Sequence, residues 1–180
     1  MDTALMEEAR QAVAGDKDAF VRLMLTMEQM LYRVARSMLK TDSECLDAVQ
    51  EAVVCAYTSI HLLREPRFFK TWLVRILLNV CYRMLREQVK VVPFAEPFRA
   101  EAEERFESKV ELQEALDSLD DDLRLAIRLH YYEGFTIREM ADILQIAEGT
   151  IKSRLVKARR LLANWYAYPN GERGAVTNEG

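Results

Sequence analysis

The stretch TIREMADILQIAEGTIKSRLVKARRLL, residues 136–162, predicts two helices joined by a tight turn, the second of them basic. Thr136 followed three residues later by Glu139 is the pattern of a capping box, which marks the start of a helix. The first helix has an apolar stripe at helical spacing, formed by Ile137, Met140, Ala141 and Leu144. We expect the turn at residues 145–147. If that turn requires a left-handed residue, Gln145 carries strain of about 1 kcal/mol.

The second helix has an apolar back and a cationic front when its residues are placed about 100° apart, from ~3.6 residues per turn. The back consists of Ile151, Leu155, Ala158 and Leu162. The front, its flanks and the first turn carry the side chains expected to meet DNA: Glu148, Gly149, Thr150, Lys152, Ser153, Arg154, Lys157 and Arg160. A helix of this kind fits the major groove, where side chains reach base edges and phosphates. An ordinary amphipathic surface helix is the alternative, since look-alikes of this motif are common.

Residues 148–162, EGTIKSRLVKARRLL, resemble the recognition helix of region four in extracytoplasmic-function (ECF) sigma factors. These are small promoter-recognition subunits of bacterial RNA polymerase. The family often has Gly in the turn where this chain has Gln145, and Pro at the opening of the helix where it has Ala147. Neither difference removes a group that contacts DNA. The resemblance implies that this helix reads the upstream promoter element.

Composition favours an all-helical protein with a buried core. Half of the 180 residues are hydrophobic, and there are only six Gly and four Pro. No apolar run approaches the ~20 residues of a membrane span, and the acidic start MDTALMEEARQ does not resemble a secretory signal. Cys45, Cys55 and Cys81 form no CxxC pair, so we expect reduced thiols in a cytoplasmic protein that is not inserted in a membrane.

The net charge of −4 conceals two basic segments separated by an acidic one. Residues 64–90 hold seven basic and two acidic side chains, a net charge of +5. Residues 148–165 hold five basic and one acidic side chain, a net charge of +4, whereas residues 95–122 have a net charge of −8. Because local charge decides where a polyanion binds, the acidic total does not argue against DNA binding.

Helical periodicity predicts further helices before the basic pair. Their expected bounds are 4–14, 18–39, 44–62, 72–88, 110–119 and 123–132. In the third of these, the residues expected to face the core are Leu46, Val49, Val53, Ala56 and Ile60. Its polar face carries Asp47, Gln50 and Glu51, which form either a binding surface or a plain solvated face.

Residues 64–71, REPRFFKT, interrupt the helical pattern, since Pro66 biases Glu65 away from helix. The helix after this break carries a polar stripe at spacings of four, four and three residues, formed by Arg75, Asn79, Arg83 and Arg86. Cations and aromatic rings together are suited to holding a single DNA strand. Phe68, Phe69 and Trp72 supply such rings, although Phe69 and Trp72 are alternatively core residues.

Two further motifs resemble region two of the same family: DAVQE at residues 47–51 and FFKTWLVRILLNVCYRMLR at residues 68–86. The family forms are DxVQE and FxxWLxRIxxN. The resemblance implies that Asp47, Gln50 and Glu51 dock on the clamp helices of core polymerase. It assigns the start-proximal promoter element to Trp72, Arg75 and Asn79, which match the motif. The cations and the ring of the same segment and stripe are expected to take part in binding and melting that element: Arg67, Phe68, Lys70 and Arg83. Arg83 stands where the family usually has Asp, and Cys45-Leu46 replace the customary Ala-Glu.

We therefore expect an all-α chain with two small helical domains joined by a flexible acidic linker, the C-terminal domain being a helix-turn-helix. The expected bounds are 1–91 for the region-two domain, 92–110 for the linker, 111–168 for the region-four domain and 169–180 for a disordered tail. The resemblance implies an ECF sigma factor that binds core RNA polymerase and promoter DNA and directs initiation, with an anti-sigma factor as its regulator. In the family the linker threads toward the RNA exit channel; a plain tether is the alternative.

Catalysis, cofactors and metals are not expected in this chain. His61 and His130 are isolated, and no metal-ligand spacing, Gly-rich phosphate loop or nucleophile motif is present. The alternative function is a two-domain helix-turn-helix regulator that acts without polymerase, and a third is a structural helical adaptor. The joint presence of DAVQE and the FxxW…R…N helix favours the sigma factor, because a plain regulator has no use for both.

Overall fold

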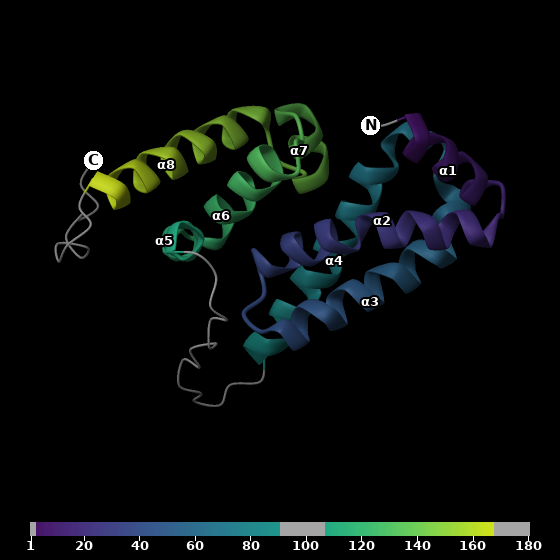
Figure 1. Ribbon diagram of the computed structural model, residues 1–180, viewed down its shortest axis with the longest axis horizontal. Helices are drawn as coiled ribbons and strands as arrows, with labels where there is room; N and C mark the ends of the chain where they lie inside the picture. Colours follow the sequence, from purple (N-terminus) through teal and green to yellow (C-terminus); the bar gives the residue numbers. More distant parts are fainter. Residues whose placement is uncertain (1–2, 91–106, 168–180) are drawn as a thin grey trace.

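The computed structural model describes residues 3–90 and 107–167, and every regular element in these ranges is helical (Figure 1). The N-terminal group consists of α1 (Thr3–Val13), α2 (Lys17–Arg36), α3 (Asp42–Ser59), η1 (Ile60–Leu62), η2 (Pro66–Phe68) and α4 (Phe69–Lys90). The C-terminal group consists of α5 (Glu107–Asp117), α6 (Asp121–Ile127), η3 (Arg128–Tyr132), α7 (Ile137–Leu144) and α8 (Glu148–Ala167). The all-α, two-domain prediction is confirmed. The two groups meet where α7 and η3 approach α4 and α2.

The expected linker and tail fall largely outside the described residues, which leave out 91–106 and 168–180. Helix α5 begins at Glu107, so its first turn lies inside the stretch predicted as linker, 92–110.

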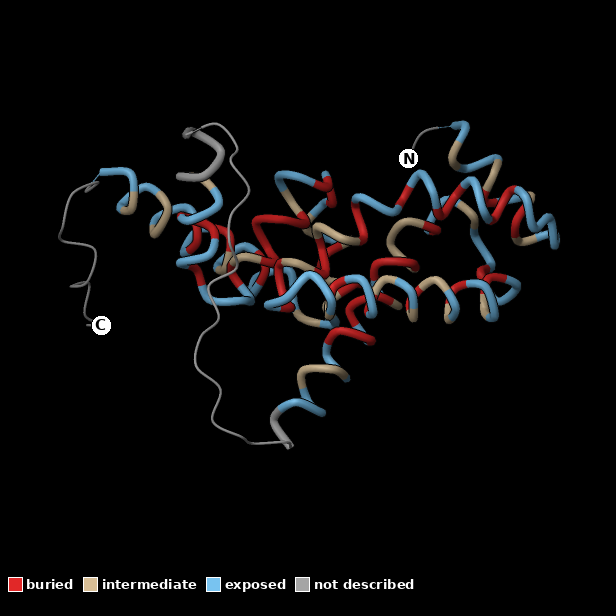
Figure 2. The backbone as a smooth tube through the Cα atoms, turned by 60° about the horizontal axis from the view of Figure 1, so that its bottom comes forward, coloured by how far each residue is buried: buried red, intermediate tan, exposed pale blue. Residues whose placement is uncertain are grey.

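Each helix buries one side and exposes the other, and buried and exposed segments alternate along the backbone in Figure 2. In the N-terminal group, Leu23, Leu31, Phe69 and Leu77 are fully buried. Complete burial of such a side chain contributes about 1.5–3 kcal/mol, so α2 and α4, which carry these residues, supply a large part of the core. Among the described helices, none combines the length and the apolar character that crossing a membrane requires.

The buried face of α3 differs from the prediction. It consists of the small residues Cys45, Ala48, Ala52 and Ala56, all of them fully buried. Leu46, expected in the core, is 52% exposed, so that prediction was wrong. Small side chains let α3 pack closely on α2 and α4, so its buried face is centred on these small residues and Leu46 falls outside it. Ala56 was among the predicted core residues and is buried. Ile60 is buried as expected, whereas Val49 and Val53 are partly buried.

Two capping boxes fix the starts of α3 and α7. Thr41 accepts from the backbone of Glu44 at 3.2 Å, and the Glu44 carboxylate accepts from the Thr41 backbone N–H at 2.9 Å. Thr136 and Glu139 make the same reciprocal pair at 3.2 and 2.8 Å, which confirms the predicted start of the helix-turn-helix. Such caps contribute about 0.5–2 kcal/mol each.

The turn of the helix-turn-helix does require a left-handed residue. Gln145 has φ 56° and ψ 41°, and it is the one non-Gly residue with positive φ in the described ranges. Its side-chain amide donates to the Asp142 carbonyl at 2.6 Å, and its backbone N–H bonds to Ala141. These bonds offset the strain of about 1 kcal/mol expected for a residue with a Cβ in this conformation.

Most helix ends differ from their predicted bounds by one to five residues, and three of them have a clear local cause. Helix α4 begins at Phe69 rather than Trp72, because Pro66 restricts only the residue before it, Glu65, which is extended with φ −124° and ψ 102°. Helix α2 ends at Arg36 rather than Leu39. There the Ser37 hydroxyl donates back to the Val34 carbonyl at 2.6 Å and closes the last turn. Helix α6 gives way at Arg128 to the wider turn η3.

All three cysteines are free thiols. Burial raises the pKa of Cys81 to about 12 and that of Cys45 to about 11. Thiolates are the reactive form of cysteine, so these two side chains behave as small apolar core residues.

Candidate nucleic-acid and polymerase interfaces

The front of α8 is an accessible cationic surface. Ile151, Leu155 and Ala158 are buried against the domain, as predicted from the helical wheel. The exposed residues are Glu148, Gly149, Thr150, Lys152, Ser153, Val156, Lys157, Arg159 and Arg160. Nothing lies within 4 Å of the position a Cβ would take on Gly149, so the start of the helix is open to close approach. The helix thus presents one face that is able to enter a DNA groove.

Arg154 is placed differently from the other cations predicted to contact DNA. Its guanidinium pairs with the Asp122 carboxylate of α6, and its side chain is only 23% exposed. Arg154 therefore ties α6 to α8, whereas Lys157 and Arg160 extend from the helix into solvent. No local pattern indicates this pairing, because Asp122 lies 32 residues earlier and fits equally well as a first-turn acid of its own helix.

A groove runs beside α8 between walls of opposite charge. One wall is formed by residues 120–123, which include three consecutive aspartates. The other is formed by Lys152, Ser153, Arg154, Val156, Lys157 and Arg160. DNA phosphates approaching α8 would meet the aspartates on this side, and like charges repel. A polyanion that entered this groove would therefore be attracted by one wall and repelled by the other.

The polar stripe of α4 is exposed as predicted. Arg75, Asn79, Arg83 and Arg86 all lie on the solvent side of the helix, opposite Leu73 and Leu77. Arg83 forms an ion pair with Glu51 of α3. This pair joins a residue predicted to contact DNA with one predicted to contact polymerase, an arrangement that sequence spacing did not reveal.

The aromatic residues before α4 divide into exposed and buried members. Phe68 is 47% exposed, and the Arg67 guanidinium lies 4.7 Å from the centre of its ring. Phe69 is fully buried and therefore belongs to the core. Trp72 is half-buried, with its ring centroid 6.0 Å from that of Phe69. Of the three rings, Phe68 is the one exposed enough to meet an unstacked base.

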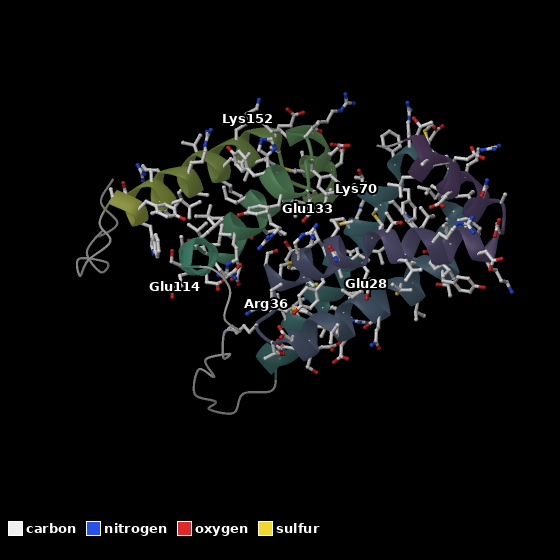
Figure 3. All side chains as sticks on the ribbon, viewed as in Figure 1. Glu28, Arg36, Lys70, Glu114, Glu133 and Lys152 are labelled. Atoms are coloured by element: carbon white, nitrogen blue, oxygen red, sulfur yellow. The ribbon has the colours of Figure 1, made fainter. Side chains whose placement is uncertain are left out.

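Lys70 does not extend into solvent like Arg67. Its ammonium group donates to the backbone carbonyl of Glu133 and lies 4.6 Å from the centre of the Phe135 ring. Figure 3 shows Lys70 and Glu133 reaching toward each other from the two groups of helices. Burial lowers the pKa of Lys70, with a smaller opposing effect from Glu133. A residue predicted to bind DNA thus lies in the contact between the domains.

The polar face of α3 is accessible. Asp47 and Gln50 are exposed, and Glu51 is half-buried beside Arg83. Leu46 adds an exposed apolar side chain next to Asp47. The three polar residues predicted to dock on polymerase therefore share one surface of α3, bordered by an apolar contact point.

Comparisons with known proteins agree with this geometry. Residues 23–91 match the family described as Sigma-70 region 2, and residues 109–162 match Sigma-70, region 4. An ECF RNA polymerase sigma factor of Mycobacterium tuberculosis, SigM, is 34% identical over 163 residues, which cover 88% of this chain and 82% of SigM.

Two solved structures are also similar at 25% sequence identity. CnrH, in complex with the cytosolic domain of CnrY, has a TM-score of 0.69; the match covers 93% of this chain and 99% of CnrH. The sigma factor RpoE of Bartonella quintana, in complex with the anti-sigma factor NepR, has a TM-score of 0.68, and the match covers 84% of this chain and 98% of RpoE.

Proposed function

The chain belongs to the ECF family of RNA polymerase sigma factors, and from that premise we propose how its two domains divide the work of promoter recognition. The first domain, residues 1–91, holds core polymerase through Asp47, Gln50 and Glu51 and binds the start-proximal element through the start and stripe of α4. The second, residues 111–168, reads the upstream element through α8. The observation that carries this proposal is the presence of one exposed cationic helix face on each matched domain.

The partners follow from the same division. Core RNA polymerase and promoter DNA are bound together, and an anti-sigma factor acts as the regulator, as NepR is found on the similar RpoE. We propose that the chain works in the cytoplasm, where the chromosome is, and that polymerase supplies the catalytic groups. Residues 92–110 connect the domains.

Comigration with core polymerase distinguishes a sigma factor from a regulator that acts without polymerase. The purified chain mixed with core enzyme should move as one complex on a native gel. That complex should retain a promoter fragment which core enzyme alone does not retain. A chain that shifts the same fragment by itself and leaves core enzyme unbound would be a free-standing regulator instead.

Phe68→Ala should impair DNA melting more than it impairs binding of the closed promoter. Unstacking a base costs a few kcal/mol per step, and stacking on an aromatic ring returns about 1–3 kcal/mol per base. Because Phe68 is 47% exposed whereas Phe69 is fully buried, removal of the Phe68 ring should leave the fold intact. Because the variant loses the energy of stacking a base on this ring, permanganate reactivity of promoter thymines in a double-stranded template should fall by about tenfold or more.

Tyr166→Ala provides the matched control, since Tyr166 is an equally exposed aromatic residue far along α8. On a promoter that is already melted, the Phe68 variant should recover most of its activity. Normal permanganate reactivity of the double-stranded template with the Phe68 variant would show that Phe68 has no role in melting.

A further inference from the structure

The two domains are joined by a partly buried ion pair. Arg33 of α2 donates to both carboxylate oxygens of Glu133, from Nε at 2.8 Å and from Nη2 at 3.1 Å. The Glu133 side chain is only 4% exposed, whereas that of Arg33 is 40% exposed. Two-point pairing of this kind is geometrically specific, and a carboxylate buried to this extent requires its partner.

The same corner of the second domain also holds Lys70 (Figure 3). The backbone carbonyl of Glu133 accepts from the Lys70 ammonium group, and the Phe135 ring lies beneath that group at 4.6 Å. Phe135 itself is 3% exposed. A third bond crosses nearby, from Arg124 to the Ser37 carbonyl at 3.4 Å. Residues 133–135 thus bind one cation from α2 and one from α4.

The contact is specific but suited to opening. Water solvates the carboxylate and both cations once the domains separate, so the loss of Coulombic attraction is largely offset by regained hydration. Contacts between domains of one chain resemble transient protein interfaces, and relative motion is their default behaviour. The contacts of residues 133–135 with Arg33 and Lys70 can therefore stabilise the closed arrangement of the two domains in the free chain and still allow the domains to separate.

We propose that residues 133–135, here called the latch, hold the free sigma factor closed and withhold Lys70 from promoter DNA until the domains separate. An ammonium group engaged with a carbonyl and a ring is not available to a phosphate. The latch therefore lowers the fraction of molecules that are competent to melt DNA. The apparent affinity for promoter DNA is the intrinsic affinity multiplied by that fraction. This role rests on the proposed function of Lys70, but the existence of the latch is tested without DNA.

Charge reversal tests the latch in the free full-length chain. Arg33→Glu and Glu133→Arg each place like charges together, and the double variant Arg33→Glu/Glu133→Arg restores an opposite pair. Small-angle X-ray scattering should give a larger radius of gyration for each single variant and a return toward the parent value for the double variant. The matched control reverses the Arg22–Glu8 pair of α1 and α2, which spans 3.1 Å within one domain and should not change the radius.

Circular dichroism distinguishes opening of the domains from unfolding of the helices. If a charge-reversal variant loses helicity, the radius of gyration is measured instead for Glu133→Gln, which keeps the side-chain size. An unchanged radius of gyration in a folded Arg33 or Glu133 variant would overturn the latch.

Run-off transcription then tests the consequence of the latch. Each open variant should reach half-maximal transcription at a several-fold lower concentration of sigma factor than the parent protein. Equal concentrations for open and closed proteins would overturn the gating of Lys70. Absence of transcription from every protein, parent included, would instead contradict the proposed function and leave the scattering result standing.

Discussion

Replacing Lys152, Lys157 and Arg160 together with alanine should abolish recognition of the upstream element by the polymerase complex. All three side chains extend from the exposed front of α8, unlike Arg154, which is held by Asp122. A hydrogen bond to a charged group contributes about 1.5–3 kcal/mol, so removing three should weaken promoter binding by at least about 100-fold. The salt dependence should also weaken, since each phosphate that is no longer neutralised lowers the log–log slope by about 0.9.

The matched control removes the same amount of charge elsewhere. Arg10, Lys17 and Arg22 are cations of α1 and α2, distant in the chain from α8, and their replacement by alanine should leave promoter affinity within a few-fold of the parent. Titration of labelled promoter at several salt concentrations measures both the affinity and its salt dependence. Equal losses of affinity in the two triple variants would mean that α8 contributes only non-specific electrostatic attraction to DNA and does not recognise the upstream element.

Asp47→Lys combined with Glu51→Lys should break the association with core polymerase. Both residues lie on the accessible face of α3, with Leu46 beside them as an apolar contact. Removing one partner of a buried charge pair in an interface costs about 2–5 kcal/mol, so reversing two should weaken binding by at least about 100-fold. Circular dichroism should remain unchanged, because neither side chain belongs to the core.

Glu51 is also paired with Arg83, and this pairing provides a second control. Arg83→Ala releases Glu51 without altering its charge, so it should retain core binding and weaken only the contact with start-proximal DNA. Glu114→Lys with Asp142→Lys makes the same change in net charge on the second domain and should also retain core binding. Normal core binding by the Asp47 and Glu51 variant would assign the polymerase contact to another surface.

The amino-acid sequence was sufficient for those parts of the fold that depend on neighbouring residues. The capping box of Thr136 and Glu139, the left-handed Gln145 and the apolar back of α8 all follow from contacts within a few positions. The exposed stripe of α4 follows in the same way. In each case helical geometry alone decides which side chains lie together.

Other features depended on packing that periodicity does not record. Leu46 is exposed because α3 buries its small residues, and large apolar side chains were a misleading guide there. Phe68 and Phe69 are adjacent and identical, yet only the second is buried, since the helix that orients them begins between them. The contact of Arg33 with Glu133 joins residues 100 positions apart, so no local pattern indicates it.

Reconstituted run-off transcription is the decisive measurement for promoter-specific initiation by this chain. Core polymerase, the purified chain and promoter fragments chosen from a genome-wide binding map should together yield transcripts with one defined start site. Core polymerase alone should yield none from the same fragments. We expect the triple α8 variant to lose the transcript from promoters that carry the upstream element. Binding of the chain to those fragments without core polymerase, and with no transcript when core polymerase is added, would contradict a role in initiation.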